Sequence, residues 1–177
     1  TFSRNHEQGL DIEELDGGSL LAALRRVEAN KNLNRGARFV ETLDGDQSLT
    51  LGHVDFSANG DDGLRIDEGG LGSQSLRGCT YTASENAGDG LQGEERGEGA
   101  VSICLRDVLV ENNTSDGIKF EEFDAGSAAI EVRDGSITGQ GTQGFDLDEQ
   151  ADGEFSVTLA DLVISGNALE GVDVTER

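Results

Sequence analysis

The sequence predicts an all-β protein, a right-handed parallel β-helix of about seven 27-residue coils with three strands in each coil. Two observations predict this fold. Glycines recur 27 residues apart along the whole chain, and apolar residues alternate with polar ones in three short bursts per repeat. The glycine series consists of Gly9, Gly36, Gly63, Gly90, Gly117, Gly144 and Gly171.

Two further residue types repeat with the same period. A glutamate stands five residues after each of these glycines, in a column made of Glu14, Glu41, Glu68, Glu95, Glu122, Glu149 and Glu176. An amide stands four residues before each glycine, in a column made of Asn5, Asn32, Asn59, Asn86, Asn113, Gln140 and Asn167. Matched columns of this kind indicate that residues 27 positions apart lie directly above one another in successive coils.

The apolar bursts predict where the strands lie. In the repeat that ends at Glu122, the bursts cover residues 101–105, 108–110 and 118–120. Alternation with a period of two is typical of strands, whose successive side chains point to opposite faces. Three parallel sheets around a narrow apolar interior are therefore expected. The amides are expected to bond unpaired backbone groups at the bend before the third strand, where the glycines supply a positive φ or close clearance.

Segments 108–120 (VLVENNTSDGIKF) and 163–174 (VISGNALEGVDV) resemble the parallel β-helix repeats of the pectate-lyase-like superfamily. The resemblance covers the whole chain and implies the fold, but it says little about chemistry. A leucine-rich repeat is the main alternative, because segment 51–59 (LGHVDFSAN) fits its consensus. The β-helix is favoured, since the apolar residue that a leucine-rich repeat requires two places after the Asn is Asp61 here.

The charge balance excludes some partners. The chain has 36 acidic and 13 basic residues and a net charge of −23, which argues against nucleic acid as a partner because phosphates would be repelled. Only Lys31 and Lys119 are lysines, and this acid-rich composition resembles that of proteins from salt-loving microbes. An acidic surface that keeps an extracellular solenoid soluble is the alternative interpretation. No apolar run is long enough to predict a membrane span.

The predicted organisation is a single β-helix domain over residues 1–177, cut from a longer solenoid or protein. No capping helix is predicted at either end, so the sheet edges would be exposed, which predicts end-to-end self-stacking or flanking domains. Cys79 and Cys104 are 25 residues apart and would lie diagonally on adjacent coils. A Cα separation of about 8 Å exceeds the usual limit for a disulfide and favours free thiols.

The glutamate column is a candidate metal site. Its carboxylates would stand about 5 Å apart, so their repulsion must be relieved. Because the glutamates have the parity of inward residues, a corner role in which each accepts N–H bonds from the following loop is favoured. The alternative is Ca²⁺, which prefers oxygen ligands. The candidate ligands are Glu41, Asp44, Glu68, Glu95, Glu122, Asp124, Glu149 and Asp152.

Segment 59–67 (NGDDGLRID) is where catalysis would be sought. Its adjacent Asp61 and Asp62 resemble the paired aspartates of polygalacturonases, and Arg65 would hold an acidic sugar. The Gly-His-Gly motif that follows in those enzymes is missing, so no residue is assigned as catalytic. A basic stripe on the first strand is interpreted as cross-strand charge pairing. It consists of Arg25, Arg77, Arg106 and Arg133.

The uniform period predicts a noncatalytic segment, extracellular or on the cell surface, that serves as a stalk, adhesin or surface-layer element. Divalent cations or salt would stabilise it, and a polysaccharide or another cell-surface component would be its partner. Enzymes of this architecture interrupt the period with loops that form a cleft, and this chain has no such insertion. The alternative is a polysaccharide-binding or polysaccharide-processing module, a lyase or a hydrolase.

Overall fold

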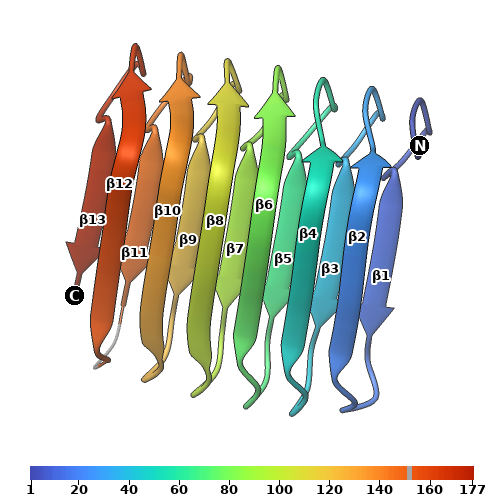
Figure 1. Cartoon of the computed structure of the whole chain (residues 1–177). Helices are drawn as coiled ribbons and strands as arrows, with labels where there is room; N and C mark the ends of the chain where they lie inside the picture. The colour runs from blue at the N-terminus through green and yellow to red at the C-terminus, as the bar shows by residue number, and fades with distance from the viewer. Residues whose placement is uncertain (151–152) are drawn as a thin grey trace.

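The computed structural model describes residues 1–150 and 153–177, which form β-strands and turns wound into a solenoid (Figure 1). Five-residue strands build the short-strand sheet: β1 (Leu10–Glu14), β3 (Ala37–Glu41), β5 (Leu64–Glu68), β7 (Leu91–Glu95), β9 (Ile118–Glu122), β11 (Phe145–Glu149) and β13 (Val172–Glu176). Longer strands build the long-strand sheet: β2 (Leu20–Glu28), β4 (Gln47–Asp55), β6 (Gln74–Ser84), β8 (Ala100–Glu111), β10 (Ser127–Thr138) and β12 (Phe155–Ser165).

The strands of each sheet are parallel and in register, which confirms the predicted fold class. Leu64 of β5 pairs with Leu91 of β7, and Leu49 of β4 pairs with Leu76 of β6. Every pair of strands keeps the offset of one repeat, because each turn has the same length. Residues 27 positions apart therefore lie in adjacent strands along the whole solenoid, as the sequence predicts.

The prediction of three strands per coil in three sheets is wrong. The first two apolar bursts of each repeat form one long strand, so each coil has two strands and the solenoid has about six turns. One non-glycine residue with a positive φ lies at the bend of each long strand, accompanied in β10 by Gly135, and the pairing resumes immediately beyond it. A single residue in the left-handed conformation changes the direction of the strand, and the pairing with the neighbouring strands is interrupted only at that residue. These residues are Arg26, His53, Thr80, Asp107, Asp134 and Asp161.

The core lies between the two sheets, where the inward residues of successive coils stack on one another (Figure 1). Burial alternates along the strands, as in β5, whose Leu64 and Ile66 are fully buried. A small inward residue leaves room for a large one in the adjacent strand. Gly93 does so for Phe120, because a Cβ on Gly93 would lie 2.2 Å from the Phe120 ring. In the part of the chain that the structure describes, no helix has the length and apolarity needed to cross a bilayer.

The amide column satisfies the backbone at the bend before each short strand, as predicted. The backbone N–H and the Nδ2 of Asn59 both donate to Oδ1 of Asn86, at 3.0 Å each. Asn86 in turn donates to Oδ1 of Asn113, and its Nδ2 also donates to the Phe56 carbonyl at 2.9 Å. The glycine nearby provides clearance, because a Cβ on Gly63 would lie 2.6 Å from the Gly90 carbonyl oxygen.

Replacing Asn86 by alanine should destabilise the solenoid by about 3 kcal/mol, because the buried Asn59 N–H and Phe56 carbonyl lose their partners. Urea denaturation would measure the change in the free energy of unfolding. Asn167→Ala is the matched control, since the half-buried Asn167 accepts one bond, from the Gln140 backbone. Equal losses in the two variants would contradict a cooperative role for the buried column.

Candidate functional site

The structure brings Asp61 and Asp62, which the sequence offered only as weak catalytic candidates, together around an arginine that the sequence did not single out. Arg35, from the preceding coil, lies 2.7 Å from Asp61 and 3.0 Å from Asp62. Arg65 instead binds Asp67 and Glu94, at 2.9 and 2.6 Å. The repeat spacing could have predicted this contact, because Arg35 stands one repeat before Asp62 and therefore lies beside it in the preceding coil.

Asp62 belongs to a column of aspartates that bonds one coil to the next. Its Oδ1 accepts the backbone N–H of Asp89 at 3.0 Å, and Oδ1 of Asp89 accepts that of Asp116 at 2.7 Å. Oδ1 of Asp116 accepts the N–H of Gln143 at 2.8 Å. Burial is the main cause that raises the pKa of Asp89 to about 6. These hydrogen bonds give Asp62 a structural role, and they account for its position without a catalytic function.

The glutamate column points into the interior at the corner after each short strand. Glu41, Glu68, Glu95, Glu122 and Glu149 are each at most 1% exposed. One oxygen of Glu41, Glu68 and Glu122 accepts a backbone N–H two residues further on, at 3.0 to 3.1 Å. The predicted corner role is therefore confirmed for these three glutamates.

Several other oxygens of these glutamates have no such donor. Oε2 of Glu41, Glu68 and Glu122 and both oxygens of Glu95 are buried without a hydrogen bond from a loop. Burial, followed by the neighbouring glutamates, raises the pKa of Glu95 to about 9. Burial is also the main cause that raises the pKa of Glu68 to about 7 and that of Glu122 above its usual value. Protons shared between adjacent carboxyls relieve the repulsion that the spacing would otherwise impose.

The predicted metal ligands divide into two locations. The glutamates line the interior, whereas Asp44 and Asp124 lie in the corner loops, where they border a depression of about 420 Å³ together with Arg96. Asp152 lies outside the described residues. Within residues 1–150 and 153–177, no group of three or more His, Cys, Asp or Glu side chains is arranged to hold a metal ion. Calcium binding stays a prediction.

The outward face of the long-strand sheet, before its bend, is nearly free of acids. We call this surface the acid-poor face, and Glu131 is the one acid among its residues. The face consists of Leu21, Ala23, Arg25, Ser48, Thr50, Gly52, Ser75, Arg77, Cys79, Ser102, Cys104, Arg106, Ala129, Glu131, Arg133, Ser156, Thr158 and Ala160. Small and hydroxyl side chains predominate on it, so the arginines stand out on a flat surface.

The outward face of the short-strand sheet is acidic by contrast. Its three cations, Arg38, Arg65 and Lys119, each lie beside carboxylates of the same face. The acids on it are Asp11, Glu13, Asp67, Glu94, Glu121, Asp146, Asp148 and Asp173. The rod therefore presents surfaces of opposite charge on its two sheets.

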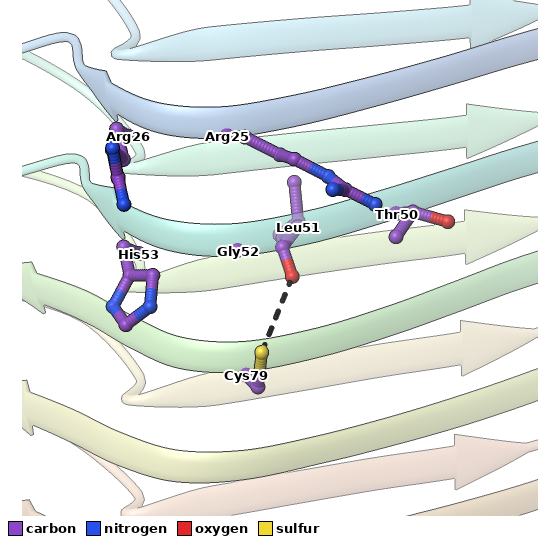
Figure 2. Close-up of a pocket in the computed structure, with 7 residues that line it drawn as sticks. All are labelled: Arg25, Arg26, Thr50, Leu51, Gly52, His53 and Cys79. Carbon is purple, nitrogen blue, oxygen red and sulfur yellow. Dashed lines mark hydrogen bonds between the residues drawn. The ribbon is translucent and has the colours of Figure 1, made fainter.

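Two depressions hollow the acid-poor face. The larger, of about 640 Å³, lies at the bend beside Arg25, Arg26, His53 and Cys79 (Figure 2). It exists partly because Gly52 has no side chain, as an added Cβ there would contact only Cγ of Arg25, at 3.8 Å. The smaller, of about 320 Å³, extends from Arg77 to Thr158 and takes in Cys104 and Glu131.

Charge pairing accounts for only part of the basic stripe. Arg106 and Arg133 share Glu131, as cross-strand pairing predicts. Arg25, Arg26 and Arg77 have no carboxylate at ion-pair distance in the described part of the chain, unlike the arginines of the other sheet.

The two cysteines also lie on the acid-poor face. Cys79 pairs in register with Arg106, and Arg77 pairs with Cys104, so the thiols are diagonal as predicted. Both are free, and Cys79 is the more exposed.

Comparisons with protein-family models, with curated proteins and with solved structures each return no match for this chain. The resemblance to the pectate-lyase-like superfamily therefore rests on the repeat and the solenoid alone.

Raising the pH from 5 to 9 should destabilise the protein through the glutamate column. A carboxyl whose pKa is higher in the folded state stabilises fully below its unfolded pKa of 4.5, and this contribution falls with rising pH until the pH passes the folded pKa, about 7 for Glu68 and about 9 for Glu95. Urea midpoints measured across this range should fall. Glu95→Gln should flatten the dependence, whereas Glu98→Gln, which alters an exposed loop glutamate, should leave it unchanged. Identical pH profiles for the two variants would contradict proton sharing.

Proposed function

We propose that this chain is a noncatalytic structural or adhesive segment of an extracellular or cell-surface solenoid, such as a stalk, an adhesin or a surface-layer element. The observation that carries this proposal is the unbroken register from β1 to β13, in which every turn repeats the same length. A uniform register produces a rod with flat faces, and such a rod suits spacing or lateral contact better than it suits enclosing a substrate.

The bonding of the aspartates supports a noncatalytic role. Asp62, which would act as an acid or base in the alternative function, already holds the Asp89 backbone N–H and the Arg35 side chain. Arg65, which would hold a sugar carboxylate, already binds Asp67 and Glu94. A catalytic carboxyl must be free to exchange a proton with the substrate, and these groups are engaged within the fold.

The acid-poor face supports the adhesive part of the proposal. It combines unpaired arginines with serine and threonine hydroxyls on a flat surface, so it offers hydrogen-bond donors to a partner that carries carboxylates or hydroxyls. Carbohydrates or other cell-surface components have such groups.

Activity measurements test this proposal against its alternative. The protein should cleave no member of a panel of acidic polysaccharides, whether cleavage is followed by reducing ends or by the absorbance of unsaturated products. Asp62→Ala should instead lower stability by about 2 kcal/mol, because the buried Asp89 N–H loses its acceptor. Cleavage by the wild-type protein that disappears in Asp62→Ala would refute the noncatalytic role.

Salt should stabilise the fold, because the net charge of −23 repels itself across the surface. We expect the unfolding temperature to rise with NaCl concentration in calorimetry. Comparing the unfolding temperature in CaCl₂ with that in NaCl at equal ionic strength distinguishes charge screening from Ca²⁺ binding. A larger rise with CaCl₂, reversed by a chelator, would support the predicted Ca²⁺ ligands, whereas equal rises would contradict them.

A further inference from the structure

We propose that the basic end of the acid-poor face binds the acidic end of the opposite sheet in a second copy of this chain, so that rods pack side by side in a staggered array. This inference rests on the proposed structural role and names its partner. It requires two complementary surfaces on one molecule, and the structure has both.

The first surface, the basic patch, consists of Arg25 and Arg77 of the acid-poor face together with Arg26 and His53 at the adjoining bend. These residues come from β2, β4 and β6, at the N-terminal end of the solenoid. Figure 2 shows Arg25, Arg26 and His53 around the larger depression, together with Cys79. None of the three arginines has a carboxylate partner in the described part of the chain, and each lies on an exposed position. The patch therefore has cationic hydrogen-bond donors that no intramolecular acceptor uses.

The second surface, the acidic patch, consists of Asp146, Asp148 and Asp173 on β11 and β13. Asp146 and Asp173 are partners in register, so two carboxylates stand side by side. Asp146 and Asp148 each have one long ion pair, with Lys119 at 3.9 Å and Arg177 at 3.8 Å, and Lys119 is shared with Glu121. Burial and the nearby aspartates raise the pKa of Asp146 to about 6, as expected for carboxylates whose repulsion is incompletely balanced.

The two patches match in geometry as well as in charge. Both lie on regular parallel sheets whose strands are about 4.8 Å apart. Arg25 pairs with Gly52 and Arg77 pairs with Thr50, so the two arginines lie two strands apart, at positions that differ by two residues. They lie on opposite sheets and at opposite ends of the rod (Figure 1). One molecule cannot bring its own patches together. A contact between them leaves a free patch of each kind, and such a heterologous contact continues into an open array.

Ionic strength should control this contact in a characteristic way. Two copies with a charge of −23 each repel one another over the Debye length, which is about 30 Å at 0.01 M salt and about 8 Å at 0.15 M. Near 1 M the Debye length falls to about 3 Å, which also weakens the arginine–carboxylate contacts. We expect monomers at low salt, the strongest association at intermediate salt and weaker association again at high salt.

Sedimentation velocity over a series of protein and salt concentrations tests the proposal. Wild-type protein should show a concentration-dependent rise in mean sedimentation coefficient near 0.15 M salt. Arg25→Ser/Arg77→Ser should abolish this rise. Arg106→Ser/Arg133→Ser is the matched control, because it removes the same charge from the same face but affects arginines that already share Glu131. The control should associate like the wild type.

A charge exchange tests whether the acidic patch is the partner. Arg25→Glu/Arg77→Glu and Asp146→Arg/Asp173→Arg should each remain monomeric, and an equimolar mixture of the two should associate. Cys79, which borders the basic patch, gives a readout on unmodified protein. Its labelling by a thiol reagent should slow as the wild-type concentration is raised.

Three outcomes would overturn the proposal. One is a wild-type protein that stays monomeric at every salt concentration, and another is association of Arg25→Ser/Arg77→Ser at wild-type strength. The third is a mixture of charge-reversed variants that fails to associate. Retention on an immobilised anionic glycan without self-association would assign the patch to a different partner. Polysaccharide cleavage would refute the proposed function but leave the sedimentation results unaffected, so the two failures are distinguishable.

Discussion

Stacking in strict register is the constraint on which the rest of this structure depends. Because every coil has the same length, each residue meets the residues at the same repeat position in the coils above and below. An inward leucine then stacks on leucine or isoleucine, as Leu64 and Leu91 do. An inward polar group is tolerated only if it can bond to a copy of itself or to the backbone, since an unsatisfied buried polar group is costly. The asparagine, aspartate and glutamate columns meet this requirement in three ways.

The three columns differ in how they use their hydrogen-bonding groups. An amide both donates and accepts, so Asn59 and Asn86 form a chain of bonds without any change in protonation. An ionised aspartate only accepts, and Asp62 and Asp89 therefore take backbone N–H groups from the next coil. Glu41, Glu68 and Glu122 each accept a backbone N–H of their own corner loop with one oxygen, whereas Glu95 accepts none with either oxygen. Proton binding is what makes a stack of carboxyls compatible with burial.

The sequence predicted those features that follow from period and parity. The register, the amide bonds and the inward glutamates bonded to the loops all follow from a 27-residue spacing and an alternating pattern. The number of sheets could not be predicted from the sequence, because no single residue type marks the bend in every long strand. Arg26, His53 and Asp107 all adopt a positive φ there, whereas a glycine would have revealed the position. The Arg35 contact with Asp62 and the isolation of Arg25 depend on side-chain directions, which periodicity leaves undetermined.

The equal length of the coils also determines which changes in chain length this architecture tolerates. Inserting or deleting a whole repeat would keep every column intact and lengthen or shorten the rod by about 4.8 Å. An insertion of another length could be accommodated only as a loop that leaves the coil at a turn, because one added residue within a strand would exchange the inward and outward side chains of the residues that follow it in that strand. Recombination between repeats, which adds or removes complete units, is therefore a route by which related rods of different lengths can arise without loss of the fold.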